Sequence, residues 1–338
     1  MRALLATGTN VVFGMPGGAI LPAYDALLHT PELRHVLVRH EQGAGYAAAG
    51  YAQTTGRVGV CMATSGPGAT NLVTAVADAY AHEVPMVVIT GQVPASLLGK
   101  DGFQEVDICG LTRNVTRHNF LVTDASRITA WVADAFAIAA GEHPGPVLVD
   151  ITKDALQSSV LTADLPPASP VRTRGFPDYP QAGLPHPDGL SASGVVDALE
   201  QCRGDQTVFV TGGGLARATA ERLPGPQTMH TPGYAVPAAI GAAFGNPGHT
   251  VWAVTTAACF LTTGRELVTA AVNGVAVKVA VLRDRQDTAV DLVGMAEAMG
   301  CAGLRCHRAA ESETTVRQAT AVQDRPVLVD FALTEPPG

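Results

Sequence analysis

The chain has 338 residues, of which 47% are hydrophobic and 15% are charged, and its formal net charge is -8. This length allows two domains with sizeable cores, and the composition is that of a globular protein rather than a disordered chain. The acidic balance argues against a nucleic-acid-binding protein, and no apolar run is long enough to predict a membrane span.

Strands and helices alternate along the first 156 residues. We predict strands at 11–13, 35–38, 58–63, 85–90 and 147–151. Helices are predicted at 2–7, from 18 to about 29, from Glu41, and at 69–80 and 125–140. The continuous apolar run at 58–63 is typical of a strand buried on both faces, and the alternation predicts a mainly parallel sheet. Residues 99–119 are long and irregular, as in an active-site loop.

A connector and a second domain follow. The connector is assigned to 157–189, because seven prolines fall between 164 and 189 without an apolar period. From 190 the strand–helix alternation resumes. Strands are predicted at 207–211, 250–254, 277–282, near Leu304 and at 327–331. Helices are predicted at 191–202, 260–272, 288–299 and from Ala309. Domain boundaries of 1–156 and 190–338 follow.

The stretch RHEQGAGYAAAGYA at 39–52 places a carboxylate, Glu41, between a strand and a helix rich in Gly and Ala. Small residues lower helix stability, by about 1 kcal/mol for each Gly relative to Ala, so something is expected to approach this helix closely. Glu41 would lie near the helix N-terminus and at the carboxyl end of a strand, where α/β sheets place their ligands. The structural alternative is a Glu that only stabilises a first helical turn.

Six motifs in this half occur in the order of a known family. They are FGMPGGAILP at 13–22, RHEQGAG at 39–45, SGPGATN at 65–71, FQEVD at 103–107, TRHN at 116–119 and GPVLVD at 145–150. Together they resemble the thiamine-diphosphate (ThDP) enzymes of the acetolactate synthase type. The resemblance implies two doubly wound α/β domains with parallel sheets, one pyrimidine-binding-like and one diphosphate-binding-like. It also implies that Glu41 hydrogen-bonds the cofactor's aminopyrimidine and drives formation of its imino tautomer.

The resemblance implies further site residues. Gln104 and His118 are predicted to act with Glu41 as catalytic or polar contacts. The other predicted residues line the cleft: Gly17, Gly18, Tyr46, Ser65, Gly66, Asn71, Phe103, Pro232, Tyr234, Ala257, Cys259 and Arg283. For the aromatic residues, the alternative is an ordinary place in a core. For His118, it is a structural histidine.

Two departures from the family stand out. The connector leaves no room for the family's central domain and its flavin or substrate contacts. The metal-binding Gly-Asp-Gly motif is replaced by Thr256, Ala257 and Ala258, and the family's Asn pair by Arg283 and Asp284. Because Mg²⁺ prefers carboxylate and phosphate oxygens, we expect no metal site, with Asp284 as a weak candidate only. Pro232 replaces the apolar residue that supports the cofactor, and Tyr46 stands where many relatives have His.

Three hypotheses therefore stay open. The first is an acetolactate synthase-like enzyme that forms or breaks a carbon–carbon bond next to a carbonyl, without conventional ThDP and Mg²⁺ and with Glu41 as general acid or base. The second is an orthodox ThDP-dependent lyase or synthase with a rearranged metal site. The third is a non-catalytic partner subunit of a heteromeric ThDP-fold enzyme. We favour the first hypothesis, which predicts that the enzyme uses no cofactor; ThDP and Mg²⁺ would be the cofactors under the second.

The expected partners are a small carbonyl substrate, such as a 2-oxo acid or ketone, and at least a second copy of the chain. The family's cleft lies between subunits, which predicts a homodimer or homotetramer. We expect neither a nucleic acid nor a membrane as a partner. The six cysteines are scattered without a CxxC pair, and Cys301, Cys306 and His307 fit no standard zinc spacing. Reduced thiols and the lack of a signal peptide predict a cytoplasmic protein.

Overall fold

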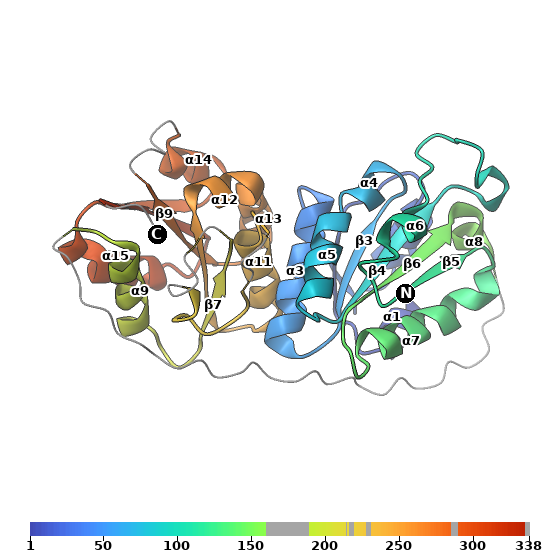
Figure 1. The fold of residues 1–338 in the computed structure, drawn as a ribbon, viewed down its shortest axis with the longest axis horizontal. Helices are drawn as coiled ribbons and strands as arrows, with labels where there is room; N and C mark the ends of the chain where they lie inside the picture. The colour runs from blue at the N-terminus through green and yellow to red at the C-terminus, as the bar shows by residue number, and fades with distance from the viewer. Residues whose placement is uncertain (160–188, 214, 216–219, 228–230, 285–289, 335–338) are drawn as a thin grey trace. The chain divides into compact units, whose positions relative to one another are not determined.

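The computed structural model describes residues 1–159, 189–213, 215, 220–227, 231–284 and 290–334 (Figure 1). The chain divides into two compact units, Met1–Arg174 and Gly175–Gly338. The boundary falls inside the predicted connector at 157–189. Most of that connector lies outside the described residues, so the assignment of its ends stays a prediction.

The first unit is built on a six-stranded sheet in the order β2-β1-β3-β4-β6-β5. All of its pairings are parallel. Its strands are β1 (Val11–Gly14), β2 (Arg34–Leu37), β3 (Gly59–Ala63), β4 (Met86–Gln92), β5 (His118–Val122) and β6 (Pro146–Thr152). Its helices are α1 (Arg2–Ala6), α2 (Leu21–Leu28), α3 (Glu41–Thr55), α4 (Pro67–Thr70), α5 (Val73–Ala81), α6 (Ile108–Thr112), α7 (Ile128–Ala139) and α8 (Lys153–Gln157), with short 3₁₀ turns η1 (Ala95–Leu97) and η2 (Ala125–Arg127).

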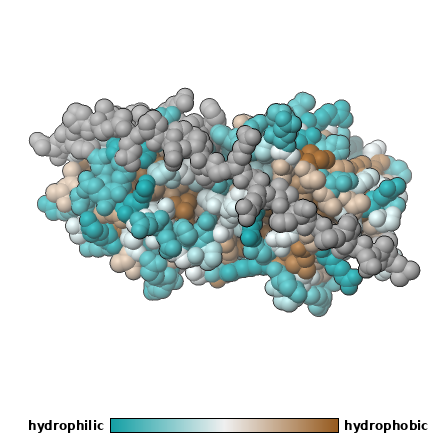
Figure 2. Space-filling view, turned by 90° about the horizontal axis from the view of Figure 1, so that it is seen from below, coloured by the Kyte–Doolittle hydropathy of each residue, from teal (hydrophilic) through white to brown (hydrophobic). Residues whose placement is uncertain are grey.

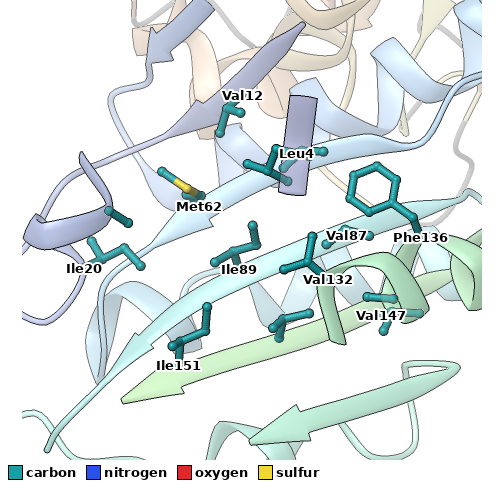
Figure 3. Close-up of a cluster of buried hydrophobic side chains, with 14 of the residues drawn as sticks. Leu4, Val12, Ile20, Met62, Val87, Ile89, Val132, Phe136, Val147 and Ile151 are labelled. Atoms are coloured by element: carbon teal, nitrogen blue, oxygen red, sulfur yellow. The ribbon is translucent and has the colours of Figure 1, made fainter. Parts of the chain in front are cut away.

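Helices cover both faces of this sheet. In Figure 1, α3 and α5 lie side by side on one face, and α1 and α7 lie on the other. The core under α1 and α7 is apolar and includes Leu4, Val87 and Phe136 (Figure 3). Every residue of β3 and β4 is buried, as the continuous apolar runs predict.

The Gly- and Ala-rich sequence of α3 has a structural cause. A Cβ on Gly59 of β3 would lie 2.1 Å from the carbonyl oxygen of Ala48, and a Cβ on Gly45 would lie 2.5 Å from the Cβ of Ala75 in α5. The helix is therefore held closely between β3 and α5, and small residues on it permit that packing.

The second unit has a five-stranded parallel sheet in the order β10-β11-β9-β8-β7. Its strands are β7 (Thr207–Thr211), β8 (Thr250–Thr256), β9 (Lys278–Arg283), β10 (Ala302–Cys306) and β11 (Val327–Ala332). Its helices are α9 (Ala192–Gln201), α11 (Ala235–Gly245), α12 (Ala257–Thr263), α13 (Leu267–Val272), α14 (Leu292–Ala298) and α15 (Ser312–Ala321), with 3₁₀ turns η3 (Gly264–Glu266) and η4 (Ala309–Glu311). The predicted fold class, two parallel-sheet α/β domains, is confirmed.

Several predicted elements differ in detail. The segment 99–119 contains α6 and the start of β5, neither of which we predicted, and α8 was also missed. The helix predicted at 260–272 is two helices separated by η3. The ring of Phe260 fills the space beside Gly264, 2.7 Å from where a Cβ would be. The helix predicted at 288–299 is α14, and residues 285–289 lie outside the described residues.

Within the described part of the chain, no helix combines the length and hydropathy that a membrane crossing needs. On the face shown in Figure 2, hydrophilic residues predominate and hydrophobic residues form small, separate patches.

Candidate functional site

Glu41 lies where β2 gives way to α3. The backbone of His40 is extended, and its Nδ1 accepts a hydrogen bond from the backbone N–H of Gln42 at 3.1 Å, which caps the helix. Glu41 is therefore the first residue of α3, and its side chain is 9% exposed. The Nδ2 of Asn71 donates to the Oε2 of Glu41 at 3.0 Å. An amide thus fixes one carboxylate oxygen close to a helix N-terminus, which favours negative charge.

Glycines leave space beside this carboxylate. A Cβ on Gly68 would lie 3.4 Å from the Oε1 of Glu41, and a Cβ on Gly17 would lie 2.5 Å from the side chain of Thr64. Gly18 has open space around its Cα. The turn after β1 and the turn after β3 therefore meet at the edge of the sheet that carries Glu41. The structure thus brings together Glu41, Asn71, Gly17 and the turn containing Ser65 and Gly66, four parts of the site predicted from sequence.

The loop 99–106 reaches the same turn. Gln104 has a positive φ of 58°, and Gly66 has a φ of 59°. A Cβ on Gly66 would lie 2.8 Å from both the Cβ and the carbonyl oxygen of Gln104. Only glycine permits this approach without displacing the loop. The backbone of Gln104 is therefore close to the site, whereas Phe103 is 88% exposed.

The carboxylate of Glu105 organises the loop. It accepts hydrogen bonds from the backbone N–H groups of Gly99, Lys100 and Gly102. These hydrogen bonds hold the pKa of Glu105 below its usual value. Further along the chain, the Nδ2 of Asn119 donates to the carbonyl oxygen of Cys109 at 2.8 Å, which ties α6 to β5.

Of two further residues predicted for the site, one lies at the opposite edge of the sheet and the other is buried within a helix. His118 is the first residue of β5 and pairs with Val147 near the start of β6. In a parallel sheet, strand starts lie at the edge opposite to strand ends, so the structure does not bring His118 together with Glu41. Tyr46 is fully buried within α3, where its hydroxyl accepts a hydrogen bond from the Nε2 of Gln42, and burial raises its pKa. We do not include either residue in the proposed site.

In the second unit, the residues after β8 are mostly apolar. Ala257 begins α12 and is 1% exposed, while Ala258 is exposed. The hydroxyl of Thr256 accepts from the backbone N–H of Cys259 at 3.4 Å, so this threonine caps α12. Tyr234, before α11, is 1% exposed. The position that the resemblance gives to a metal-binding carboxylate is thus a buried methyl group, which supplies no ligand oxygen.

The cation at the end of β9 is already engaged. The Nε of Arg283 donates to both carboxylate oxygens of Asp330 on β11, at 2.8 and 3.0 Å. Their side chains are 14% and 6% exposed, respectively. Arg283, which we predicted to line the cleft, is thus paired with a carboxylate of its own unit. Asp284 is half-buried and Pro232 is exposed. Across the described residues, no three His, Cys, Asp or Glu side chains are grouped so that they could hold a metal ion.

These observations define a two-unit α/β framework with a buried glutamate after the second strand, which is the class of ThDP-type enzymes. Comparison with known proteins agrees. The family model described as "Thiamine pyrophosphate enzyme, N-terminal TPP binding domain" matches residues 1–111. The model described as "Thiamine pyrophosphate enzyme, C-terminal TPP binding domain" matches residues 214–290. Thiamine pyrophosphate (TPP) and ThDP are the same compound.

One of the relatives aligns with nearly the whole chain, and others align with about half to two thirds of it. An acetolactate synthase of Mycobacterium bovis is 32% identical, over 98% of this chain and 87% of the relative. The acetolactate synthase large subunit of Corynebacterium glutamicum is 50% identical over 65% of this chain and 34% of that protein. The isozyme 2 large subunit of Escherichia coli is 56% identical over 46% of this chain and 28% of that protein. The chain belongs to the thiamine pyrophosphate enzyme family and is acetolactate synthase-like, as the six motifs predicted.

The comparison also bears on the missing central domain. The alignment with the Mycobacterium bovis protein spans 535 residues, against 338 in this chain. The relative therefore has a large segment with no counterpart here. This is consistent with the predicted replacement of the central domain by a connector.

One prediction is wrong. We expected no cofactor, because the metal motif is altered. Both matched family models are described as TPP binding domains, and they cover segments of both units. An altered motif at one end of a cofactor site does not outweigh membership in a family that depends on that cofactor.

The residues of the first unit fit the aminopyrimidine end of ThDP. A buried carboxylate can hydrogen-bond a ring nitrogen, Asn71 holds its other oxygen, and Gly68 permits close approach. In the second unit, a Cβ on Gly212, just after β7, would lie 3.0 Å from the Cβ of Ala235, so the chain packs closely there, but Ala257 replaces the carboxylate of the family's metal motif. The fit therefore rests on the first unit.

Sequence reasoning missed two buried polar residues that are linked by hydrogen bonds to the loop 99–106. Gln92 donates to the carbonyl oxygen of Val106 and to the carboxylate of Asp150. Asp150 ends the motif GPVLVD, and its charge directly follows an apolar run. That contrast between a buried strand and a carboxylate was the available signal.

Proposed function

We propose that this protein is an enzyme that forms or breaks a carbon–carbon bond next to the carbonyl of a 2-oxo acid or ketone. The observation that carries the proposal is the buried Glu41, held by Asn71 beside Gly68, in a chain of the thiamine pyrophosphate enzyme family. When bound, ThDP supplies a carbon nucleophile for addition to a carbonyl. The name of these relatives, acetolactate synthase, supports this substrate class.

Proton transfer is assigned to Glu41, a residue of the chain itself. Asn71 fixes the Oε2 of Glu41, which leaves Oε1 on the side of Gly68. Glu41 accepts and returns a proton at that oxygen, and its burial excludes water that would compete for the hydrogen bond. The backbone of Gln104, beside Gly66, places its amide side chain near the same edge of the sheet. We assign Gln104 to substrate contact.

The first test is calorimetric titration of the purified protein with ThDP, with Mg²⁺ or with a chelator, followed by turnover of pyruvate and other 2-oxo acids. We expect saturable binding and consumption of at least one 2-oxo acid. Binding that survives the chelator would show that Mg²⁺ is dispensable. Binding without turnover of any 2-oxo acid or ketone would contradict the proposed reaction.

We also propose that the enzyme works as an assembly of at least two copies. Several relatives are named as large subunits, and Phe103 is 88% exposed on a loop that reaches the site. Association that covered this ring would remove its apolar surface from water, which favours assembly. Sedimentation of the purified protein, with and without ThDP, measures the assembly. A monomer under both conditions would contradict it.

A second candidate is a subunit that completes its site with a different ThDP-fold chain. The observation that favours it is the buried methyl of Ala257 in place of a carboxylate. In that case the pure protein would bind no ThDP, and adding an intact acetolactate synthase large subunit would restore binding.

A further inference from the structure

A buried hydrogen-bond network connects the sheet of the first unit to the loop 99–106. Asp150 on β6 is 1% exposed, and its Oδ1 accepts from the hydroxyl of Thr90 at 2.6 Å. Its Oδ2 accepts from the Nε2 of Gln92 at 2.9 Å. The same Nε2 donates to the carbonyl oxygen of Val106 at 2.8 Å. A carboxylate on one strand is thus linked, through an amide on the next, to the backbone of the loop.

The orientation of the Gln92 amide is determined by its partners. Its Oε1 accepts from the backbone N–H of Val93 at 2.9 Å, while both hydrogens of Nε2 are directed to oxygen atoms. A flipped amide would face the Val93 N–H with a donor and would face Asp150 and Val106 with an acceptor. Gln92 is 3% exposed, so water does not readily replace a lost partner. Asp150 therefore holds the amide in the one orientation that binds Val106.

Val106 is two residues after Gln104. The backbone of Gln104 lies against Gly66, and the carboxylate of Glu105 binds three N–H groups of the preceding turn. The loop is therefore internally ordered by Glu105, but Val106 is where Gln92 attaches it to the sheet. The side chain of Lys100 is exposed, but its backbone N–H is held by Glu105. Without the attachment at Val106, we expect this turn to open away from Gly66 more often, which frees the backbone at Lys100.

The network keeps a buried carboxylate that is costly to ionise. Burial is the largest influence on Asp150 and raises its pKa to about 6, although the hydrogen bonds from Thr90 and Gln92 act in the opposite direction. Asp107 lies near enough to raise the pKa further. An apolar side chain at this position would avoid that cost, but it would leave the Nε2 of Gln92 without the acceptor that Asp150 supplies.

We propose that Gln92, oriented by Asp150, is a positioning residue that holds the loop 99–106 against Gly66 and so fixes Gln104 in the site. This inference rests on the proposed function for the role of Gln104. The attachment of the loop itself is independent of that function. Gln92 does not touch substrate in this account; it acts through Val106.

The chain's lysines permit a direct test of the attachment. The sequence contains only three, Lys100, Lys153 and Lys278. Lys100 is exposed in the loop, Lys153 is half-buried at the start of α8, and Lys278 is buried on β9. A lysine-specific protease therefore reports loop opening at Lys100, while cleavage at the other two sites reports unfolding of each unit. Mass spectrometry of the fragments gives the three rates separately.

The main variant is Gln92→Met, which keeps an unbranched side chain but removes the amide. Of the three hydrogen bonds that Gln92 makes through its side chain, only the one to Val106 attaches the loop. We therefore expect cleavage at Lys100 to rise about tenfold relative to cleavage at Lys153 and Lys278. The matched control is Thr90→Val. It removes a buried hydrogen bond to the same carboxylate but leaves Gln92 and Val106 paired, so cleavage at Lys100 should stay as in the wild type.

A second pair of variants tests the role of Asp150. In Asp150→Asn, one oxygen can still accept from Gln92 while the amide nitrogen faces Thr90, so the loop should stay protected. In Asp150→Leu, no acceptor remains and Lys100 should become as accessible as in Gln92→Met. Equal cleavage at Lys100 in Gln92→Met and Thr90→Val would overturn the proposal, as would equal protection in Asp150→Leu and Asp150→Asn.

Turnover then separates this inference from the proposed function. If the wild type converts a 2-oxo acid, Gln92→Met should lower kcat about tenfold, and an unchanged kcat with an open loop would overturn the positioning of Gln104. If the wild type converts none, the proposed function fails. The protease result still decides whether Gln92 holds the loop.

Discussion

The two units differ at the edge of the sheet where their strands end. In the first unit, the segments after β2 and β3 bring a carboxylate, an amide and glycine turns together around Glu41. In the second unit, the segment after β8 begins a helix with buried Ala257, and the charges of Arg283 and Asp330 neutralise each other. The two units share one architecture. At the strand ends, however, the first unit has polar groups around Glu41, whereas the second has buried apolar residues and an ion pair. The fold alone therefore does not determine whether the strand ends of a unit carry a functional site.

The largest expected effect comes from the carboxylate of the first unit. Glu41→Gln keeps the size of the side chain and an oxygen that can accept from Asn71, but it removes the group that takes up a proton. We expect turnover of a 2-oxo acid to fall at least about 100-fold. The control is Glu32→Gln, an exposed glutamate before β2, which should keep wild-type turnover. Full activity of Glu41→Gln would remove this carboxylate from the mechanism.

A second prediction concerns the buried carboxylate of Asp150 in the first unit, which the variant Asp150→Asn replaces by a neutral amide. Because the pKa of Asp150 is raised from 3.8 to about 6, the folded state holds a proton that the unfolded chain releases between these values. The wild type therefore loses stability as pH rises from about 4 to about 6, and the full loss is about 3 kcal/mol above this window. The variant stays neutral and should not show this loss.

Urea denaturation of both proteins at several pH values measures the difference. The free energy of unfolding of Asp150→Asn should exceed that of the wild type by up to about 3 kcal/mol at pH 7.5, and the gap should close toward pH 4. A gap that is independent of pH would show that Asp150 does not titrate in this window.

Sequence patterns predicted most of the strands and helices of the two units and part of the site. The apolar runs of β3 and β4 were recognisable because both faces of these strands are buried. β5 was missed because it is an edge strand with a single buried residue, and α6 and α8 are only five residues long. Local patterns carry little signal for elements that depend on a single neighbouring strand or on tertiary contacts.

The site shows the same limit. Glu41 and Asn71 were assigned to one site through the resemblance, because they lie in the motifs RHEQGAG and SGPGATN. His118 could not be excluded from sequence, because only the start of β5 at residue 118 puts it at the opposite edge of the sheet. The link from Asp150 through Gln92 to Val106 joins residues 14 and 58 positions apart, a relation that no spacing rule predicts.

The smallest of the expected effects tests the second unit. Ala257→Asp places a carboxylate on a residue that is 1% exposed, whereas Ala258→Asp places it one position further, on an exposed residue of the same helical turn. Both lie in the first turn of α12, where the helix dipole favours negative charge equally. A difference between them therefore isolates burial. Without a cation, we expect Ala257→Asp to lower the free energy of unfolding by about 2 kcal/mol and Ala258→Asp to change it by less than about 0.5 kcal/mol.

Adding Mg²⁺ and ThDP completes this comparison. If the strand ends of the second unit still approach the cofactor diphosphate, the new carboxylate of Ala257→Asp gains a cation as partner. The stability lost should then return, while Ala258→Asp stays unchanged. Thermal unfolding with and without Mg²⁺ and ThDP measures both. An Ala257→Asp variant that stays destabilised with both present would mean that the polypeptide around β8 has repacked beyond the loss of one ligand.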